Sequence, residues 1–360
     1  MVVTNKEAAG KSAAVADGMR THAGDPNRWL NRFAWFTVAA TLLLICSGGM
    51  VTSKNAGLAV PDWPTTFGYN MFLFPASKWV GGILFEHTHR LIASTVGFLT
   101  LILAGWLWRT ESRRWVQLLG LAAVGAVILQ GVLGGIRVTL LKDEIGIFHA
   151  CLAQAFLGLL VVIALVTSQT WIRANSLALA DAQKLRALAL ATTAIIYVQL
   201  ALGATMRHEH RDLSITDFPT AYGQWIPDTS SAAIAKINSI RDARGLSDVT
   251  VEQIWLQMAH RFGAIIVTAG VIAFFVAAPR EKFSPLRKLS GIWLIGIFLQ
   301  LALGAWTIWS NKAADIATAH VAVGATMFGL GIAICAFCLK RQTATEMPPS
   351  RRSSLASVRM

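Results

Sequence analysis

Charged residues are scarce in this chain of 360 residues: only 14% are Asp, Glu, Lys or Arg, whereas 54% are hydrophobic. Soluble globular domains carry about 25% charged residues, so this composition excludes a water-soluble globule. Cysteine is scarce too, and all 4 cysteines fall in long apolar segments, which leaves no pair for a disulfide in an outer loop. The chain is therefore expected to be an integral membrane protein.

Long apolar runs fill most of the sequence. A helix needs roughly 20 residues to cross about 30 Å of hydrocarbon. Runs of that length occur at 33–52, 82–108, 115–138, 146–171, 186–206, 253–278, 288–309 and 315–339. They predict an all-α integral membrane fold with eight transmembrane helices. The polar ends predict a disordered cytoplasmic extension (1–30) and a cytoplasmic tail (341–360).

Lys and Arg are distributed unevenly between the segments that join these runs. If both termini are cytoplasmic, the inner segments hold twice as many basic residues as the outer ones, although their total lengths are similar. Basic residues are retained on the cytoplasmic side, so we predict a multi-pass protein of the inner (plasma) membrane with both termini inside. The net charge of +13 then reflects topology and attraction to anionic lipid, and gives no reason to expect nucleic acid.

The chain contains an internal repeat. GGMVTSKNAGLAVPDWPTTFG (48–68) aligns without a gap on GATMRHEHRDLSITDFPTAYG (203–223), and EHTHR (86–90) aligns on QMAHR (257–261). The offset between the halves grows along the chain because the second half has a longer outer loop, at about 207–250, whose role the sequence does not reveal.

The repeat divides the chain into two units of four helices, 31–172 and 183–340. An even number of spans gives both units the same orientation. We therefore predict two tandem four-helix bundles related by a pseudo-twofold axis along the membrane normal.

Histidine is the residue type that this repeat singles out. His22 in the extension and His208 and His210 in the long outer loop are expected to be solvated, and His87 is given no role. The remaining four occupy matching positions, His89 and His149 in the first unit and His260 and His320 in the second. A lone membrane histidine is usually a hydrogen-bonded packing residue, but ionisable groups inside a bilayer are costly, and four at matched positions favour ligands.

Two imidazoles that face each other across a bundle form an axial pair for haem iron, and two pairs would hold two haems. A zinc or copper site needs further ligands, and no additional Cys, His or carboxylate recurs in both units. Each histidine lies a few residues after the start of its span, which puts it roughly 8–12 Å below the outer end at about 1.5 Å per residue. Both haems are thus expected side by side in the outer leaflet.

The two units differ at one ionisable position. Glu86 precedes His89 by three residues and shares its helix face, whereas its counterpart Gln257 cannot ionise. We interpret Glu86 as a catalytic proton acceptor beside the first haem, with a structural hydrogen bond as the alternative. Arg90 and Arg261 follow the histidines of their units. Each is a candidate partner for a haem propionate, or is bound by carbonyls or a carboxylate within the bundle.

Three further patterns have structural interpretations. The repeated Gln-x-x-x-Gly motif, at Gln130, Gln199 and Gln300, indicates close helix packing, with a cofactor contact as the alternative. The spacing of Cys335 and Cys338 resembles a metal or redox pair but favours small packing residues near the inner face. Asp62 and Asp217 favour turns before the prolines that follow them, and could also cover the haem edges.

Together, EHTHR, FHACLAQAF, MAHRFG, TAHVAVGATM and the loop GLAVPDWPTTFG resemble the haem A synthase family over nearly all of residues 30–340. The resemblance implies an oxidoreductase that acts on a CH group, oxidising the C8 methyl of haem O to the formyl group of haem A by successive hydroxylations. It also implies that His260 and His320 hold a permanent haem B, while His89 and His149 receive the substrate haem beside Glu86. Some members carry a cysteine pair in an outer loop, which this chain lacks.

The expected partners are haem O, the enzyme that supplies it, an electron donor and membrane lipid. The residues leave open the identity of the donor, the source of oxygen, the route of substrate entry and the formation of a homo-oligomer. Two alternatives are a two-haem electron-transfer cytochrome, which needs no difference between Glu86 and Gln257, and a haem carrier with exchangeable ligation.

Overall fold

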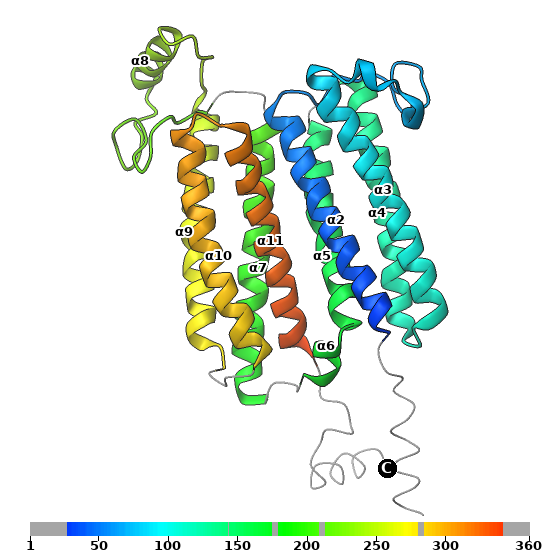
Figure 1. Ribbon diagram of the computed structural model, residues 1–360. Helices are drawn as coiled ribbons and strands as arrows, with labels where there is room; N and C mark the ends of the chain where they lie inside the picture. Colours follow the sequence, from blue (N-terminus) through cyan, green and yellow to red (C-terminus); the bar gives the residue numbers. More distant parts are fainter. Residues whose placement is uncertain (1–26, 143, 175–178, 209–212, 280–283, 341–360) are drawn as a thin grey trace, which may run out of the picture.

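The computed structural model describes residues 27–142, 144–174, 179–208, 213–279 and 284–340. Eight helices in this part of the chain are long and apolar enough to cross a membrane (Figure 1). They are α2 (Arg28–Ser53), α3 (Gly81–Thr110), α4 (Arg114–Leu140), α5 (Glu144–Val166), α7 (Leu179–His208), α9 (Val251–Ala277), α10 (Pro285–Trp309) and α11 (Ala314–Leu339). The shorter elements are α6 (Gln169–Arg173), α8 (Ser231–Asp242), η1 (Met71–Leu73) and η2 (Ala76–Lys78).

The prediction of an all-α membrane fold with eight spans is confirmed. The first and fifth spans begin several residues earlier than predicted, at Arg28 and Leu179. The fourth, expected to reach residue 171, is shorter, because α5 ends at Val166. There the Thr167 hydroxyl donates to the carbonyl of Ile163 (2.8 Å), and the Ser168 side chain caps the short helix α6. Local capping by hydroxyl side chains therefore ends a helix that hydrophobicity alone would continue. Residues 1–26 of the predicted extension, which include His22, and the tail lie outside the described residues, as do the side chain of His208 and all of His210. The end of the extension was predicted wrongly, because α2 begins at Arg28, where the Asn27 side chain caps the helix and Leu30 is buried.

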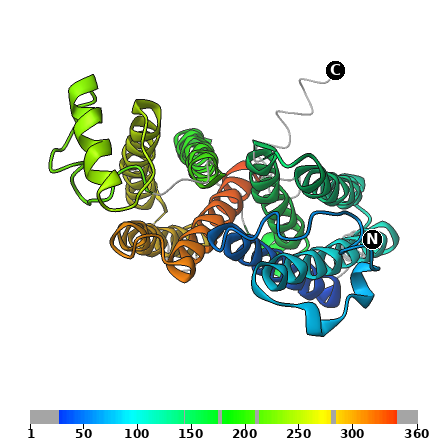
Figure 2. The same ribbon diagram turned by 90° about the horizontal axis from the view of Figure 1, so that it is seen from above.

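The helices form two groups that meet along the middle of the molecule. Seen from above, α2 to α5 lie on one side and α7, α9 and α10 on the other, with α11 between them (Figure 2). Contacts between the groups join α11 to α2, α5 to α7, and α11 to α5. The most apolar windows of α5 and α11 are 56% and 61% buried, against 17–33% for the other spans, so these two helices are central. A twofold axis between the groups would place α5 and α11, the last helix of each group, together at the centre. The axis itself stays a prediction.

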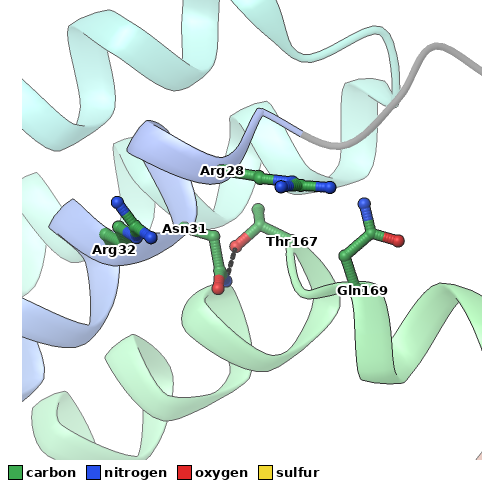
Figure 3. A pocket seen from close by; sticks show the side chains of 5 residues that line it. All are labelled: Arg28, Asn31, Arg32, Thr167 and Gln169. Carbon is green, nitrogen blue, oxygen red and sulfur yellow. Dashed lines mark hydrogen bonds between the residues drawn. The ribbon is translucent and has the colours of Figure 1, made fainter.

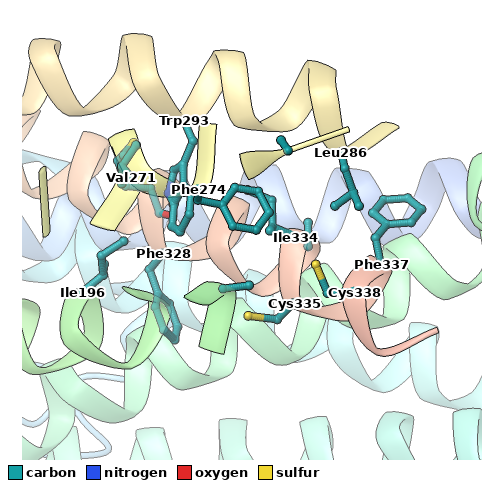
Figure 4. Packing of buried hydrophobic residues seen from close by; sticks show 14 of the residues in the cluster. Ile196, Val271, Phe274, Leu286, Trp293, Phe328, Ile334, Cys335, Phe337 and Cys338 are labelled. Atoms are coloured by element: carbon teal, nitrogen blue, oxygen red, sulfur yellow. The ribbon is translucent and has the colours of Figure 1, made fainter. Parts of the chain in front are cut away.

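A hydrophobic cluster packs the second group, together with Val161 and Leu165 of α5, in the half of the bundle that lies away from the long loops (Figure 4). Its centre is Trp293 on α10, which is fully buried, meets the ring of Phe274 edge-on at 5.8 Å between centroids, and donates from Nε1 to the carbonyl of Met327 (2.9 Å). Lipid is as apolar as these side chains, so van der Waals packing holds the helices together here. Cys335 and Cys338 are buried and free in this cluster, as their packing interpretation predicts.

The longest connections, called the outer loops after the side of the membrane on which they are predicted to lie, are at the end of the bundle opposite to α6, at residues 54–80 and 213–250 (Figure 1). Both contain the repeated Asp-aromatic-Pro-Thr sequence, and the peptide bonds Trp63–Pro64 and Phe218–Pro219 are both cis. The four matched histidines lie in the parts of their helices nearest to these loops.

Candidate functional site

In the first group, two imidazoles are seated against glycines of neighbouring helices. A Cβ atom on Gly48 of α2 would lie 3.1 Å from Cε1 of His89 on α3. A Cβ atom on Gly134 of α4 would lie 3.4 Å from Cε1 of His149 on α5. The absence of a side chain at these glycines therefore lets each ring lie directly on the adjacent helix.

The second group repeats this arrangement. Gly203 of α7 seats His260 of α9, with 3.4 Å between an added Cβ and Cε1, and Gly304 of α10 seats His320 of α11, with 3.1 Å. The rings of His260 and His320 have centroids 6.4 Å apart and planes inclined by 62°. An iron atom about 2 Å from one nitrogen of each ring would hold the centroids about 6 Å apart, so this pair fits an axial haem ligand pair.

The polar surroundings of these histidines also suit ligands. The Nδ1 atoms of His89, His149, His260 and His320 are all buried without a hydrogen-bond partner in the structure. A packing histidine in a membrane would satisfy its ring by well-formed hydrogen bonds, whereas these Nδ1 atoms make none, although the backbones of Gln130, Gln199 and Gln300 lie near the imidazoles of His149, His260 and His320. The described residues contain no cluster of three or more His, Cys, Asp or Glu side chains that could hold a bare metal ion.

The glutamines of the Gln-x-x-x-Gly motif contact the same histidines. Gln130 donates from Nε2 to the carbonyl of His149 (3.0 Å), and Gln199 donates to the carbonyl of His260 (2.6 Å). Nε2 of Gln300 lies 3.4 Å from Nε2 of His320. The motif thus packs helices as predicted, since its glycines seat rings while two of its glutamines fix the backbone of the ligand helix. A direct cofactor contact stays a prediction.

Glu86 is buried and clamps the first outer loop onto α3. Its Oε2 accepts from the amide of Val60 (2.9 Å), and its Oε1 accepts from Nη2 of Arg90 (2.9 Å). In the second group, Gln257 binds both the amide (2.8 Å) and the carbonyl (3.1 Å) of Ile215. Val60 and Ile215 are themselves matched by the repeat. The position therefore has a shared structural task, and only the first group fills it with an ionisable group.

Arg90 and Arg261 bind the carbonyls of the outer loops. Arg90 donates from Nη1 to Asp62 (2.7 Å) and Thr65 (3.1 Å), and from Nη2 to Val60 (2.8 Å). Arg261 donates to the carbonyls of Asp217 (2.7 Å), Thr220 (2.9 Å) and Pro219 (3.4 Å). These contacts are the structural alternative left open for both residues. A propionate contact stays a prediction for both.

The turn interpretation of Asp62 and Asp217 is confirmed. The Asp62 carboxylate accepts from the amides of Phe67 (2.7 Å) and Gly68 (2.9 Å) and from the Thr65 hydroxyl (2.5 Å), and Asp217 makes the matching set. Partial burial raises the pKa of each carboxyl, but these hydrogen bonds outweigh burial and hold the pKa below its usual range.

His87 contacts the first outer loop, and its ring does not pack against a glycine as the four matched histidines do. Its ring is fully buried between Phe74 and Trp79, at centroid distances of 5.1 and 4.8 Å, and Nδ1 lies 3.3 Å from the Thr66 hydroxyl. Its counterpart Met258 is buried in the loop cluster of the second group. Both side chains therefore help to anchor their outer loops.

Two features of the site were missed by sequence reasoning. The glycine seats were visible only as coincidences in the repeat, such as Gly48 with Gly203, without a partner to explain them. Arg137 and Arg207 lie near the loop ends of α4 and α7, in the same part of the bundle as the histidines, and Arg207 reaches the carbonyl of Ala317 about one turn before His320. Their repeat partners, Thr307 for Arg137 and Thr52 for Arg207, are not basic, so the repeat carried no signal for either arginine.

A hollow at the opposite end of the bundle is unrelated to the histidine pairs. It is lined by Arg28, Asn31, Arg32, Thr167 and Gln169 (Figure 3). The Asn31 side chain donates to the carbonyl of Ala164 (2.6 Å) and to the Thr167 hydroxyl (3.0 Å), which joins the start of α2 to the end of α5. The hollow therefore lies at a helix junction rather than at a candidate haem site.

Comparison with known proteins gives one consistent match. Residues 31–332 match the family described as cytochrome oxidase assembly protein, COX15-CtaA. The heme A synthase of Lysinibacillus sphaericus is 26% identical over 313 residues, covering 84% of this chain and 93% of that protein. The heme A synthase of Bacillus licheniformis is 27% identical over 325 residues (87% and 96%), and that of Shewanella oneidensis is 27% identical over 315 residues (81% and 90%).

Proposed function

Because this chain belongs to the cytochrome oxidase assembly protein family, we propose that it catalyses haem A synthesis, oxidising the C8 methyl group of haem O to a formyl group. The relatives that match it over most of their length are heme A synthases. The reaction proceeds by successive hydroxylations of one carbon and loss of water. The chain is thus an oxidoreductase of the membrane that acts on a CH group.

The contrast between Glu86 and Gln257 is the observation from which we assign the substrate haem to one histidine pair and haem B to the other. Both side chains clamp an outer loop at matched positions, so the loop contact alone requires no charge. The substrate haem is assigned to His89 and His149, beside the carboxylate. A resident haem B is assigned to His260 and His320, where the matched side chain cannot take up a proton.

The chain's own residues hold, orient and exchange protons in this scheme. When bound between His260 and His320, haem B supplies one-electron transfer. His89 and His149 orient the substrate from opposite sides, and the glycine seats fix the planes of their rings. The two oxygens of the Glu86 carboxylate offer about four lone-pair sites and use two of them in hydrogen bonds, which leaves a site for a proton released by the substrate.

The sites lie toward the outer leaflet if both termini are cytoplasmic. At about 1.5 Å per residue, the four histidines lie roughly 8–14 Å from the loop ends of their helices. Haem O would reach the first group from the bilayer or from the enzyme that makes it, and an electron donor would serve the second. Two haems at one depth suit exchange between neighbours rather than conduction across the membrane.

Two variants test this function, each of which replaces a residue by the one found at the matched position of the other group. Glu86→Gln keeps an oxygen acceptor for the Val60 amide, as Gln257 does for Ile215, but removes the proton acceptor. We expect this variant to retain both haems and to form at least about 100-fold less haem A, the usual scale of a lost general base. The matched variant Gln257→Glu should keep measurable haem A formation.

The assay is the haem A content of membranes from cells supplied with haem O, with haem occupancy measured from the absorption spectrum. Normal haem A formation by Glu86→Gln would contradict the catalytic role. Haem A lost equally in both exchanged variants would show that the loop clamp, rather than the carboxylate, is what the reaction needs.

A further inference from the structure

The two candidate haem sites approach each other where α2 meets α11. A Cβ atom on Gly49 of α2 would lie 3.2 Å from Cγ2 of Thr318 on α11. Gly49 directly follows Gly48, the seat of His89, and Thr318 precedes His320 by two residues. Packed residues thus connect a ligand of one site to a ligand of the other without passing through a loop.

Arg207 spans this contact from the outer end of α7. It donates from Nη2 to the carbonyl of Gly49 (2.7 Å) and to the hydroxyl of Ser53 (2.5 Å), and from Nη1 to the carbonyl of Ala317 (3.4 Å). Ala317 precedes His320 by three residues, and Arg207 itself follows Gly203, the seat of His260, by one helical turn. One guanidinium therefore joins three helices that carry or seat ligands of both sites.

The acceptors of Arg207 are neutral. Both ion pairs among the described residues lie elsewhere, at Glu86 with Arg90 and at Glu111 with Arg113. A cation at the end of a membrane span is held at a cost unless it serves a charge nearby. Nη1 of Arg207 donates to the carbonyl of Ala317 (3.4 Å), about one helical turn before His320, so the positive charge is fixed beside the stretch of α11 that carries this candidate ligand.

We propose that Arg207 is a positioning residue that couples the two haem sites, holding α2, α7 and α11 together and raising the reduction potential of the haem bound by His260 and His320. This rests on the proposed function. Its physical basis is that a fixed positive charge disfavours ferric iron, which carries one more positive charge than ferrous iron. At the effective dielectric of a partly buried site, the charge changes the one-electron equilibrium by about tenfold, which corresponds to about 59 mV.

The test is a spectroscopic redox titration of the purified holoprotein in detergent. Arg207→Gln removes the charge but keeps an amide donor for Gly49, and we expect its second-site potential to fall by about 59 mV. Arg207→Lys keeps the charge and should keep the potential. Ser53→Asp places a carboxylate beside the guanidinium and should lower the potential even if Arg207→Gln does not hold haem.

The matched control is Arg241→Gln, because Arg241 is buried in α8 and bonded to the carbonyls of Ser247 (2.7 Å) and Leu213 (2.9 Å), and none of these hydrogen bonds involves a candidate ligand or its glycine seat. It should lower thermal stability and leave the potential unchanged. Unchanged potentials in Arg207→Gln and Ser53→Asp would overturn the proposal, as would an equal fall in Arg207→Gln and Arg207→Lys. A wild-type protein without a bis-histidine haem spectrum would instead overturn the proposed function itself.

Discussion

The contact between Gly304 and the imidazole of His320 predicts how much haem affinity a substitution of this glycine should cost. In Gly304→Ala the new Cβ atom would lie 3.1 Å from Cε1 of the imidazole, closer than the ordinary contact range of 3.4–4 Å. The ring must then move by a few tenths of an ångström. Overpacking of this kind costs about 1–3 kcal/mol, which corresponds to about 5- to 150-fold weaker haem binding.

Gly291→Ala on the same helix is the matched control, because its nearest heavy atom, in the Phe275 ring, would be 4.0 Å away. It should leave haem binding unchanged and raise stability by up to about 1 kcal/mol, since alanine is the better helix former. The assay is a titration of haem-depleted protein with haem B, followed at the Soret band. Equal affinities for wild type, Gly304→Ala and Gly291→Ala would refute the account of the seat.

Two further predictions concern the loops and the core. Because hydrogen bonds hold the pKa of Asp62 below its ordinary value of 3.8, its carboxylate stabilises the outer loop fully above that pH and less as the pH falls through the lowered pKa. Limited proteolysis of the outer loops should therefore accelerate only in strong acid, whereas Asp62→Asn should show acceleration already at neutral pH. Trp293→Ala removes a fully buried ring and its hydrogen bond to Met327, and should lower the free energy of unfolding by about 3 kcal/mol in a detergent unfolding titration.

The fold could be predicted from the sequence because the bilayer allows few solutions. Runs of about 20 apolar residues in a chain with so few charges fix the number of spans. The repeat then placed His89, His149, His260 and His320 in two pairs, since matched positions on matched helices must face matched neighbours. The end of α5 at Val166 could not be read this way, because it depends on capping by two hydroxyl side chains rather than on hydrophobicity.

The contacts of the arginines could not be predicted for a different reason. Arg90 and Arg261 adjoin candidate ligands in sequence, yet their guanidinium groups reach the carbonyls of loops 25 or more residues away. The repeat partner of Arg207 is not basic, and its acceptors Gly49 on α2 and Ala317 on α11 are 158 and 110 residues distant along the chain. Long side chains choose partners by tertiary geometry, which spacing along one helix does not report.

The glycines illustrate a signal that was present but had no interpretation until the helices were packed. Gly48 and Gly203 coincide in the repeat, and so do Gly134 and Gly304. In the structure, the imidazole of a candidate ligand packs directly against each of these four glycines. A glycine that recurs one helix away from a recurring histidine therefore predicts a ligand seat in a membrane bundle.

The central claim is that one site keeps haem B while the other converts haem O. The most direct test is to produce the protein with a supply of haem O, purify it in detergent, extract its non-covalent haems into acidified solvent and identify them by chromatography and mass. The account predicts haem B together with haem A or a hydroxylated form of haem O. Two haem B molecules per chain, with neither product present, would contradict it and favour an electron-transfer cytochrome.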